Sequence, residues 1–191
     1  MTKGSKMSKN WHGLLRIQEI TLFSCDNEIV WQKSNLRNIF HDEGQKLMLK
    51  CCFANSMDNE VERILPPKNY NFGLDNRITL AAEDTVASID GEPDKSTGYR
   101  RFAVKPDTFE IVQVSGVWTA RSPALQFKAT SEFGPVRNVF LSATTQEFDD
   151  LGDIVDTNYL ISSVPFNEPV TVAPGQFFSV KMVLSLQDIP L

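Results

Sequence analysis

The sequence predicts a mainly β protein: a two-sheet antiparallel sandwich of jelly-roll type with one main helix at about residues 40–55. Two observations favour this class. Short segments with alternating apolar and polar residues follow one another through the second half of the chain. Turn-forming residues separate these segments at near-regular spacing, as in sandwiches and barrels.

The first elements are predicted to form a hairpin. Strands at residues 14–23 and 28–33 flank a turn at Asp26-Asn27. Strict alternation in the first strand divides its residues between two faces. One face would carry Leu15, Ile17, Glu19 and Thr21, and the other Leu14, Arg16, Gln18, Ile20 and Leu22.

The helix is predicted from a change of period. Apolar or small residues recur at helical spacing at Phe40, Gly44, Leu47, Met48, Cys51 and Cys52. Asp42 and Gln45 resemble a capping pair at its start. Beyond it, we expect a strand at 70–74, a helical turn or two within 79–89, and a surface loop at 90–98.

The remaining strands are expected at 99–105, 108–115, 117–121, 124–131, 136–143, 159–164, 169–173 and 176–186. In the last of these, Phe178, Val180, Met182, Leu184 and Leu186 form the apolar face, and Pro174-Gly175 makes the turn before it.

The charge of the chain is unevenly distributed. Its 191 residues carry a net charge of −5, and this acidic balance argues against nucleic acid as the main partner. Residues 1–18 nevertheless contain basic side chains and no acidic ones. We therefore expect an extended basic N-terminal arm at 1–12 and a single β-sandwich domain at 13–191. The arm residues expected to bind a partner are Lys3, Lys6, Lys9 and Trp11, with Trp11 as an aromatic anchor.

Several classes of site and location are not expected. No apolar stretch is long enough for a membrane span, and no apolar run follows the N-terminal lysines as it would in a signal peptide. Cys25, Cys51 and Cys52 are expected to be buried, reduced thiols of a protein assembled in a reducing cytosol.

The residues that could carry chemistry form no recognisable motif. His12 and His41 lack catalytic or zinc-binding spacing, and His41 is expected to be solvated or to cap the helix. No nucleotide-binding glycine motif is present, so no cofactor and no enzymatic activity are expected. The acidic stretch 149–156 is expected to be a solvated hairpin loop, with a Ca²⁺ site as the alternative. Trp31 and Trp118 are expected to pack in the core or an interface, with sugar stacking as the alternative.

Five stretches, in this order, resemble a group of small virion structural proteins of tailed bacteriophages: Asn38–Phe53, Tyr70–Arg77, Ala87–Arg100, Trp118–Thr144 and Val170–Leu186. The resemblance covers nearly the whole domain and implies a virion component. It transfers no catalytic residue and does not place the protein within the particle.

The function expected from these features is that of a capsid decoration or cement protein clamping neighbouring capsid subunits. It would be assembled in the host cytoplasm and contact other virion proteins and copies of itself. The alternatives are a tail or neck adaptor, a tail-fibre-associated protein, or a receptor- or glycan-binding module.

Overall fold

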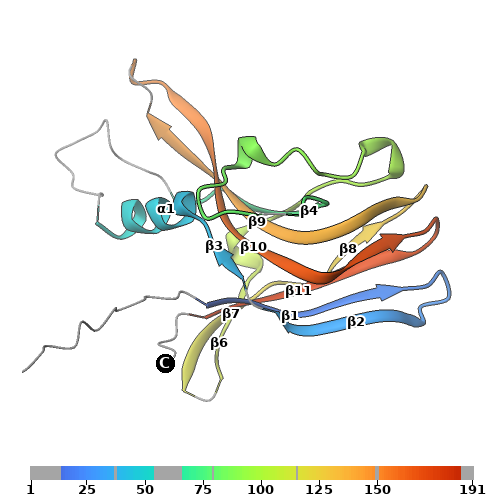
Figure 1. The fold of residues 1–191 in the computed structure, drawn as a ribbon. Helices are drawn as coiled ribbons and strands as arrows, with labels where there is room; N and C mark the ends of the chain where they lie inside the picture. The colour runs from blue at the N-terminus through green and yellow to red at the C-terminus, as the bar shows by residue number, and fades with distance from the viewer. Residues whose placement is uncertain are drawn as a thin grey trace, which may run out of the picture.

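The computed structural model describes residues 14–36, 38–53, 66–78, 80–114, 116–148 and 151–185. Within them the chain forms two antiparallel sheets and one α-helix, so the predicted mainly β class is confirmed (Figure 1). Sheet A has the order β2-β1-β11-β7-β6, with β8 also paired to β11; sheet B has the order β3-β10-β9-β4-β5. The elements are β1 Leu14–Phe23, β2 Ile29–Leu36, β3 Ile39–Phe40, α1 Asp42–Phe53, β4 Asn69–Asp75, β5 Phe102–Val104, β6 Glu110–Val114, β7 Val117–Arg121, β8 Leu125–Lys128, β9 Phe133–Phe148, β10 Ile154–Val172 and β11 Phe177–Ser185.

Strand β11 is the centre of sheet A. One of its sides pairs with β1, and the other pairs with β8 and then β7. The chain between β8 and β7 stays attached because Ser122 N–H donates to the Met182 carbonyl at 2.9 Å and Met182 N–H donates to Ser122 Oγ at 3.0 Å. The predicted apolar face is confirmed at Phe178, Val180 and Met182, which are buried.

Sheet B is built on the long β9–β10 hairpin and is covered on both faces. Residues 138–143 and 159–164 are buried without alternation, which is typical of a strand with material on each side. In Figure 1, sheet A lies against one face and the segment after β4 runs over the other. Phe140 of β9 stands opposite Gly73 of β4, and a Cβ atom on Gly73 would lie 2.1 Å from the ring, so only glycine leaves room for it.

A β-bulge changes the face assignment predicted for β1. The ladder pairs Ile17 with Met182, skips one residue, and then pairs Glu19 with Lys181 and Ile20 with Val180. The ladder with β2 stays regular from Ile17 to Glu19 and shifts only between Leu22 and Phe23. Strict alternation across 14–23 therefore does not describe the pairing with β11, because the extra residue places Ile17 and Ile20 on the same side of that ladder.

Helix α1 docks on sheet B through a second bulge. The register shifts between Leu160 and Ser162, and the carbonyl of the extra residue Ile161 accepts the His41 N–H at 3.0 Å. A Cβ atom on Gly44 would lie 2.6 Å from this same carbonyl oxygen. The helical spacing predicted from Gly44 and Leu47 is confirmed, since both are buried, whereas Met48 is exposed.

Two predicted turns and one predicted helical turn are present in the structure. The turns at Asp26-Asn27 and Pro174-Gly175 are present, and Asn27 and Gly175 have the positive φ that such turns require. The predicted helical turn is a 3-10 turn at Val86–Ser88. The strands predicted at 159–164 and 169–173 form one continuous strand, β10, whose ladder with β9 shifts register between Pro165 and Val170.

The jelly-roll order of strands is not confirmed. A jelly roll passes successive strands between its two sheets. Here, β1–β2, β4–β5, β6–β7 and β9–β10 are each neighbours within one sheet. The coarser prediction, a β protein with two antiparallel sheets and one helix among the described residues, holds.

Candidate functional site

The residues of the predicted partner-binding arm lie outside the described part of the chain. Lys3, Lys6, Lys9 and Trp11 belong to residues 1–13, as does His12. The boundary predicted at residues 12 and 13 falls in the same segment, so the arm and its role stay predictions. The functional surfaces below are those of residues 14–185.

His41 is buried, so the solvated alternative was wrong. It stands at the helix start as predicted, because its carbonyl accepts the Gln45 N–H at 3.0 Å just before α1. Its Nε2 lies 2.7 Å from Ser163 Oγ, and both side chains are almost fully covered beneath α1. Burial lowers the pKa of His41, although the nearby backbone carbonyl of Ala82 and the charge of Asp84 act in the opposite direction. Nδ1 has no partner. This histidine–serine contact joins residues 122 positions apart, and no spacing in the sequence predicted it.

Glu43 holds α1 in the same place. Its Oε2 accepts hydrogen bonds from Leu160 N–H at 2.7 Å and from Val86 N–H at 3.2 Å. Asp42 N–H donates to the Ala82 carbonyl at 2.9 Å. The carboxylate therefore links the helix, strand β10 and the segment at 81–86, and these charge-assisted hydrogen bonds stabilise the fold.

Arg77 is the hub of a second polar cluster. Its Nε contacts Asp75 Oδ2 at 2.9 Å, and its Nη1 contacts Asp84 Oδ1 at 3.3 Å and the Ser88 carbonyl at 3.1 Å. Asp75 is almost fully buried. Burial opposes the charge of Arg77, but these two carboxylates raise its pKa above the usual value. The cluster fixes the long connection after β4 against its own strand end.

A third cluster joins Glu92, Tyr99 and Arg101. The buried Tyr99 hydroxyl donates to Glu92 Oε2 and accepts the Leu74 N–H, each at 2.9 Å. Arg101 binds both oxygens of Glu92 and stacks its guanidinium over the Phe140 ring, 5.1 Å from the centroid. Burial and the Glu92 carboxylate raise the pKa of Tyr99. Glu92 and Tyr99 belong to the Ala87–Arg100 stretch that carries the resemblance, and both serve to fix this loop.

The two tryptophans in strands differ in their exposure. Trp31 packs on the core beside Phe166 and Phe178, as predicted. Trp118 is 65% exposed, so it does not pack in the core, and its packing in an interface stays a prediction. On the same hairpin, Ile111 is 62% exposed. Ile111 and Trp118 lie on the same face of this hairpin, and we call them the hairpin surface. Alternation in the sequence placed Trp118 on a strand but gave no signal that its side chain would be exposed.

Further apolar side chains are exposed at the tip of the β9–β10 hairpin, where Leu151 is 87% exposed and Ile154 is 55% exposed. Figure 1 shows this tip projecting beyond the rest of the sheet. The acidic positions 149 and 150 lie outside the described residues. The Asp156 carboxylate accepts hydrogen bonds from Lys68 Nζ and Gln146 Nε2. Among the described residues, no group of side chains is arranged to hold a metal ion.

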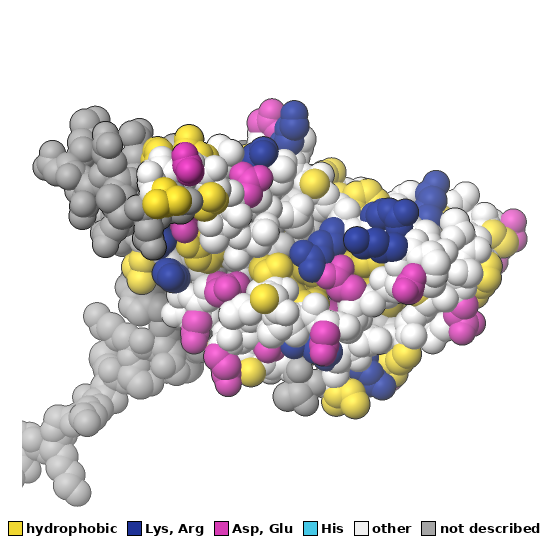
Figure 2. Space-filling view, turned by 90° about the horizontal axis from the view of Figure 1, so that it is seen from above, with side chains coloured by type: hydrophobic (Ala, Val, Ile, Leu, Met, Phe, Trp, Pro, Cys, Tyr) yellow, Lys and Arg dark blue, Asp and Glu magenta, His cyan; other side chains and the backbone are white. Residues whose placement is uncertain are grey.

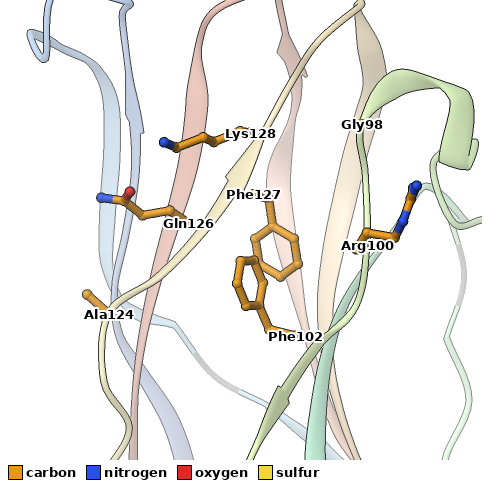
Figure 3. Close-up of a pocket in the computed structure, with 7 residues that line it drawn as sticks. All are labelled: Gly98, Arg100, Phe102, Ala124, Gln126, Phe127 and Lys128. Atoms are coloured by element: carbon orange, nitrogen blue, oxygen red, sulfur yellow. The ribbon is translucent and has the colours of Figure 1, made fainter.

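A cleft of about 580 Å³ opens at one edge of the molecule, between β8 and the segment that leads into β5 (Figure 3). Phe102 and Phe127 meet edge-to-face in it, with ring centroids 5.0 Å apart. Figure 3 shows Lys128 and Arg100 on opposite sides of these rings. The cleft is lined by Gly98, Arg100, Phe102, Ala124, Gln126, Phe127 and Lys128, so its charged lining residues are basic. Figure 2 shows Lys and Arg side chains gathered near the middle of one face, with acidic and hydrophobic ones beside them.

The cysteines are only partly as expected. Cys25 is exposed, which overturns its predicted burial, because it lies in the turn after β1 and not in a strand interior. Cys51 is partly buried against the core, and the side chain of Cys52 lies outside the described part of the structure. In the described part of the chain, no helix has the length and apolar character needed to cross a bilayer.

Comparisons of the chain with protein-family models, with curated proteins and with solved structures gave no match. The polar clusters around Glu43, Arg77 and Glu92 stabilise the fold. Among the described residues, the exposed apolar hairpins and the edge cleft are the candidate surfaces for contact with other molecules.

Proposed function

We propose that this protein is a non-enzymatic structural component of a virion, most specifically a capsid decoration or cement protein that clamps neighbouring capsid subunits. The observation that carries the proposal is the exposure of large apolar side chains on two hairpins, represented by Trp118 and Leu151. Exposed apolar side chains on projecting elements are typical of surfaces that are covered by another protein.

In this mechanism, the exposed apolar side chains would be buried against neighbouring capsid subunits where the subunits meet. Contacts made only in the assembled particle stabilise that state and leave the free chain unchanged. The polar clusters support this role because they fix the connection between β4 and β5, giving a rigid body between the contact surfaces. The arm residues Lys3, Lys6, Lys9 and Trp11 are proposed to reach a neighbouring subunit.

The proposed partners and location are those expected from the sequence. The partners are virion proteins and copies of this chain, with neither nucleic acid nor membrane as a partner, and the location is the virion after assembly in the host cytoplasm. No cofactor is proposed. A jelly-roll relationship of the sheets stays a prediction beyond the two-sheet architecture. A tail or neck adaptor, or a tail-fibre-associated protein, is the alternative within the same class.

Stoichiometry in purified particles tests the proposal. Quantitative mass spectrometry should find hundreds of copies per particle for a capsid protein and a dozen or fewer for a neck or tail protein. Absence of the chain from purified particles would contradict both. A variant that lacks residues 1–11 should fold but load poorly onto particles. Equal loading of the two forms would show that the arm has no part in attachment.

The edge cleft favours a second candidate function, a receptor- or glycan-binding module. Its aromatic floor and the basic residues Arg100 and Lys128 suit a ligand with an apolar face and a negative charge. Calorimetric titration with carboxylated and with neutral sugars tests this candidate. Binding of the carboxylated sugar that Lys128→Glu weakens would support it, and no binding of either sugar would remove it.

A further inference from the structure

Strand β8 borders the edge cleft with a side whose backbone groups are directed into the cleft. Its other side pairs with β11. Ala129, directly after β8, donates its N–H to the Gln176 carbonyl at 3.1 Å and accepts the Gly175 N–H at 2.9 Å, so its backbone groups face β11. The backbone groups of successive residues in a strand point to opposite sides. Those of Gln126 and Lys128 therefore face away from β11, into the cleft that both residues line.

The opposite wall of the cleft touches the chain after β8 at one end. The Thr97 carbonyl accepts the Thr130 N–H at 2.9 Å, and a Cβ atom on Gly98 would lie 2.8 Å from Thr130 Oγ1. Figure 3 shows the two walls diverging from Gly98 toward Ala124. The cleft between them has a volume of about 580 Å³, within the range of about 300–1,000 Å³ typical of ligand sites. It is therefore closed at the end next to Thr130 and widens along β8.

The side chains that line the cleft differ between its floor and its rim. Phe127 is buried and Phe102 packs against it, so the floor is aromatic. Gln126 and Lys128 are exposed, because side chains alternate between the two faces along β8. Figure 3 shows these two side chains pointing away from the rings. A molecule lying along β8 would therefore meet an aromatic floor on one side and polar side chains on the other.

The charged residues of the two walls are both basic. Lys128 is exposed on β8. Arg100 is exposed on the opposite wall, and its Nη1 donates to the carbonyls of Lys95 at 2.9 Å and of Tyr99 at 2.6 Å. These bonds fix one positive charge beside the cleft, and Lys128 supplies a second. Positive charge on both walls favours a ligand that carries carboxylates.

We propose that the edge cleft binds an extended acidic segment of a partner protein, which joins sheet A as a strand beside β8. The backbone of the segment would exchange hydrogen bonds with the N–H and C=O groups of Gln126 and Lys128. Residues opposite each other in such pairs share a face, so carboxylates of the segment would lie beside Lys128. The alternate side chains would be apolar and lie over Phe102 and Phe127. This inference does not rest on the virion role, because the contacts require only such a segment.

The outward backbone groups favour a peptide over a sugar as the occupant. A carboxylated sugar, the ligand of the second candidate function, would use the aromatic floor and the basic rim. It has no feature that matches N–H and C=O groups at every second residue of β8. An extended peptide presents complementary groups at the same spacing. A peptide therefore matches the backbone groups as well as the floor and the rim.

A synthetic peptide of alternating valine and glutamate tests the proposal with the full chain. Calorimetric titration should show binding, and NMR should show that the amide hydrogens of Gln126 and Lys128 become protected from exchange. The Phe127 amide faces β11 already and should change little. The glutamate N–H groups are those that would face β8. Methylation of the glutamate nitrogens should therefore prevent binding, whereas methylation of the valine nitrogens is the matched control and should preserve it.

Variants of β8 test the protein side of the same contacts. Lys128→Glu should raise the Kd of the peptide about tenfold, since it sets like charges opposite each other. Lys33→Glu is the matched control, at an exposed lysine of β2 on another edge of sheet A, and should leave the Kd unchanged. Gln126→Pro removes one outward N–H and should weaken binding, and an edge strand tolerates proline where its N–H faces outward. Gln126→Val keeps this N–H and should bind as the native chain does.

Three results would overturn the inference: no binding of the valine–glutamate peptide, equal binding of its two methylated forms, or an unaltered Kd for Lys128→Glu. Binding of a carboxylated sugar without binding of the peptide would also overturn it and would favour the second candidate function. None of these results bears on whether the chain is found in virions.

Discussion

The Tyr99 hydroxyl offers the sharpest test of how the connection between β4 and β5 is held. The change is Tyr99→Phe, which keeps the ring against Phe127 and Phe133 and removes one oxygen. That oxygen accepts the Leu74 N–H and donates to Glu92, and Leu74 is fully buried. The variant leaves a buried N–H without an acceptor, which costs about 1–3 kcal/mol.

Urea unfolding measures this cost directly. With a slope of about 2 kcal/mol per molar urea, the midpoint should fall by about 0.5–1.5 M with the slope unchanged. Tyr70→Phe is the matched control. The Tyr70 hydroxyl has no hydrogen bond among the described residues, so its loss should change the free energy of unfolding by about 0.5 kcal/mol or less. Equal losses for the two variants would show that the Leu74 N–H finds another partner and would refute the reasoning.

Three further predictions concern the other buried contacts. The free energy of unfolding should fall as the pH drops below about 6.5, because the unfolded chain takes up a proton at His41 and burial lowers the pKa of this residue in the folded chain. In His41→Asn the dependence on pH should be smaller, and His12 is the one histidine that remains. Arg77→Gln should cost about 3 kcal/mol in chemical denaturation, because Asp75 keeps a buried charge without its partner, whereas Arg137→Gln, at a half-buried arginine with no ion pair among the described residues, should cost less. Gly73→Ala should cost about 1–3 kcal/mol and lower the thermal midpoint, since the Phe140 ring must move, and an unchanged midpoint would contradict the packing described.

The elements with local signals could be predicted from the sequence. The hairpin at Asp26-Asn27, the helix around Gly44 and Leu47 and the apolar face of β11 all depend on residues close together in the chain. The faces of β1 could not, because the bulge after Ile17 is set by the neighbouring strands and not by composition.

The candidate surfaces were harder to predict for the same reason. Alternation placed Trp118 on a strand but carried no information about whether another strand or sheet would cover it. The contact between His41 and Ser163 and the one between Glu43 and Leu160 N–H join segments more than a hundred residues apart. Such contacts follow from the packing of α1 on β10, which exists only after the sheets have formed.

The central place of β11 has a consequence for the order in which the protein can fold during its synthesis. Strands β1, β7 and β8 leave the ribosome before β11, yet each of them pairs with it. Ile20 and Leu22 of β1 lie opposite Val180 and Phe178 of β11, so they reach their full burial only after β11 has been translated. Sheet B is under no such constraint, because its main strands β9 and β10 are consecutive. A nascent chain should thus form sheet B first, and a product that stops before residue 177 would leave three strands of sheet A without their shared partner.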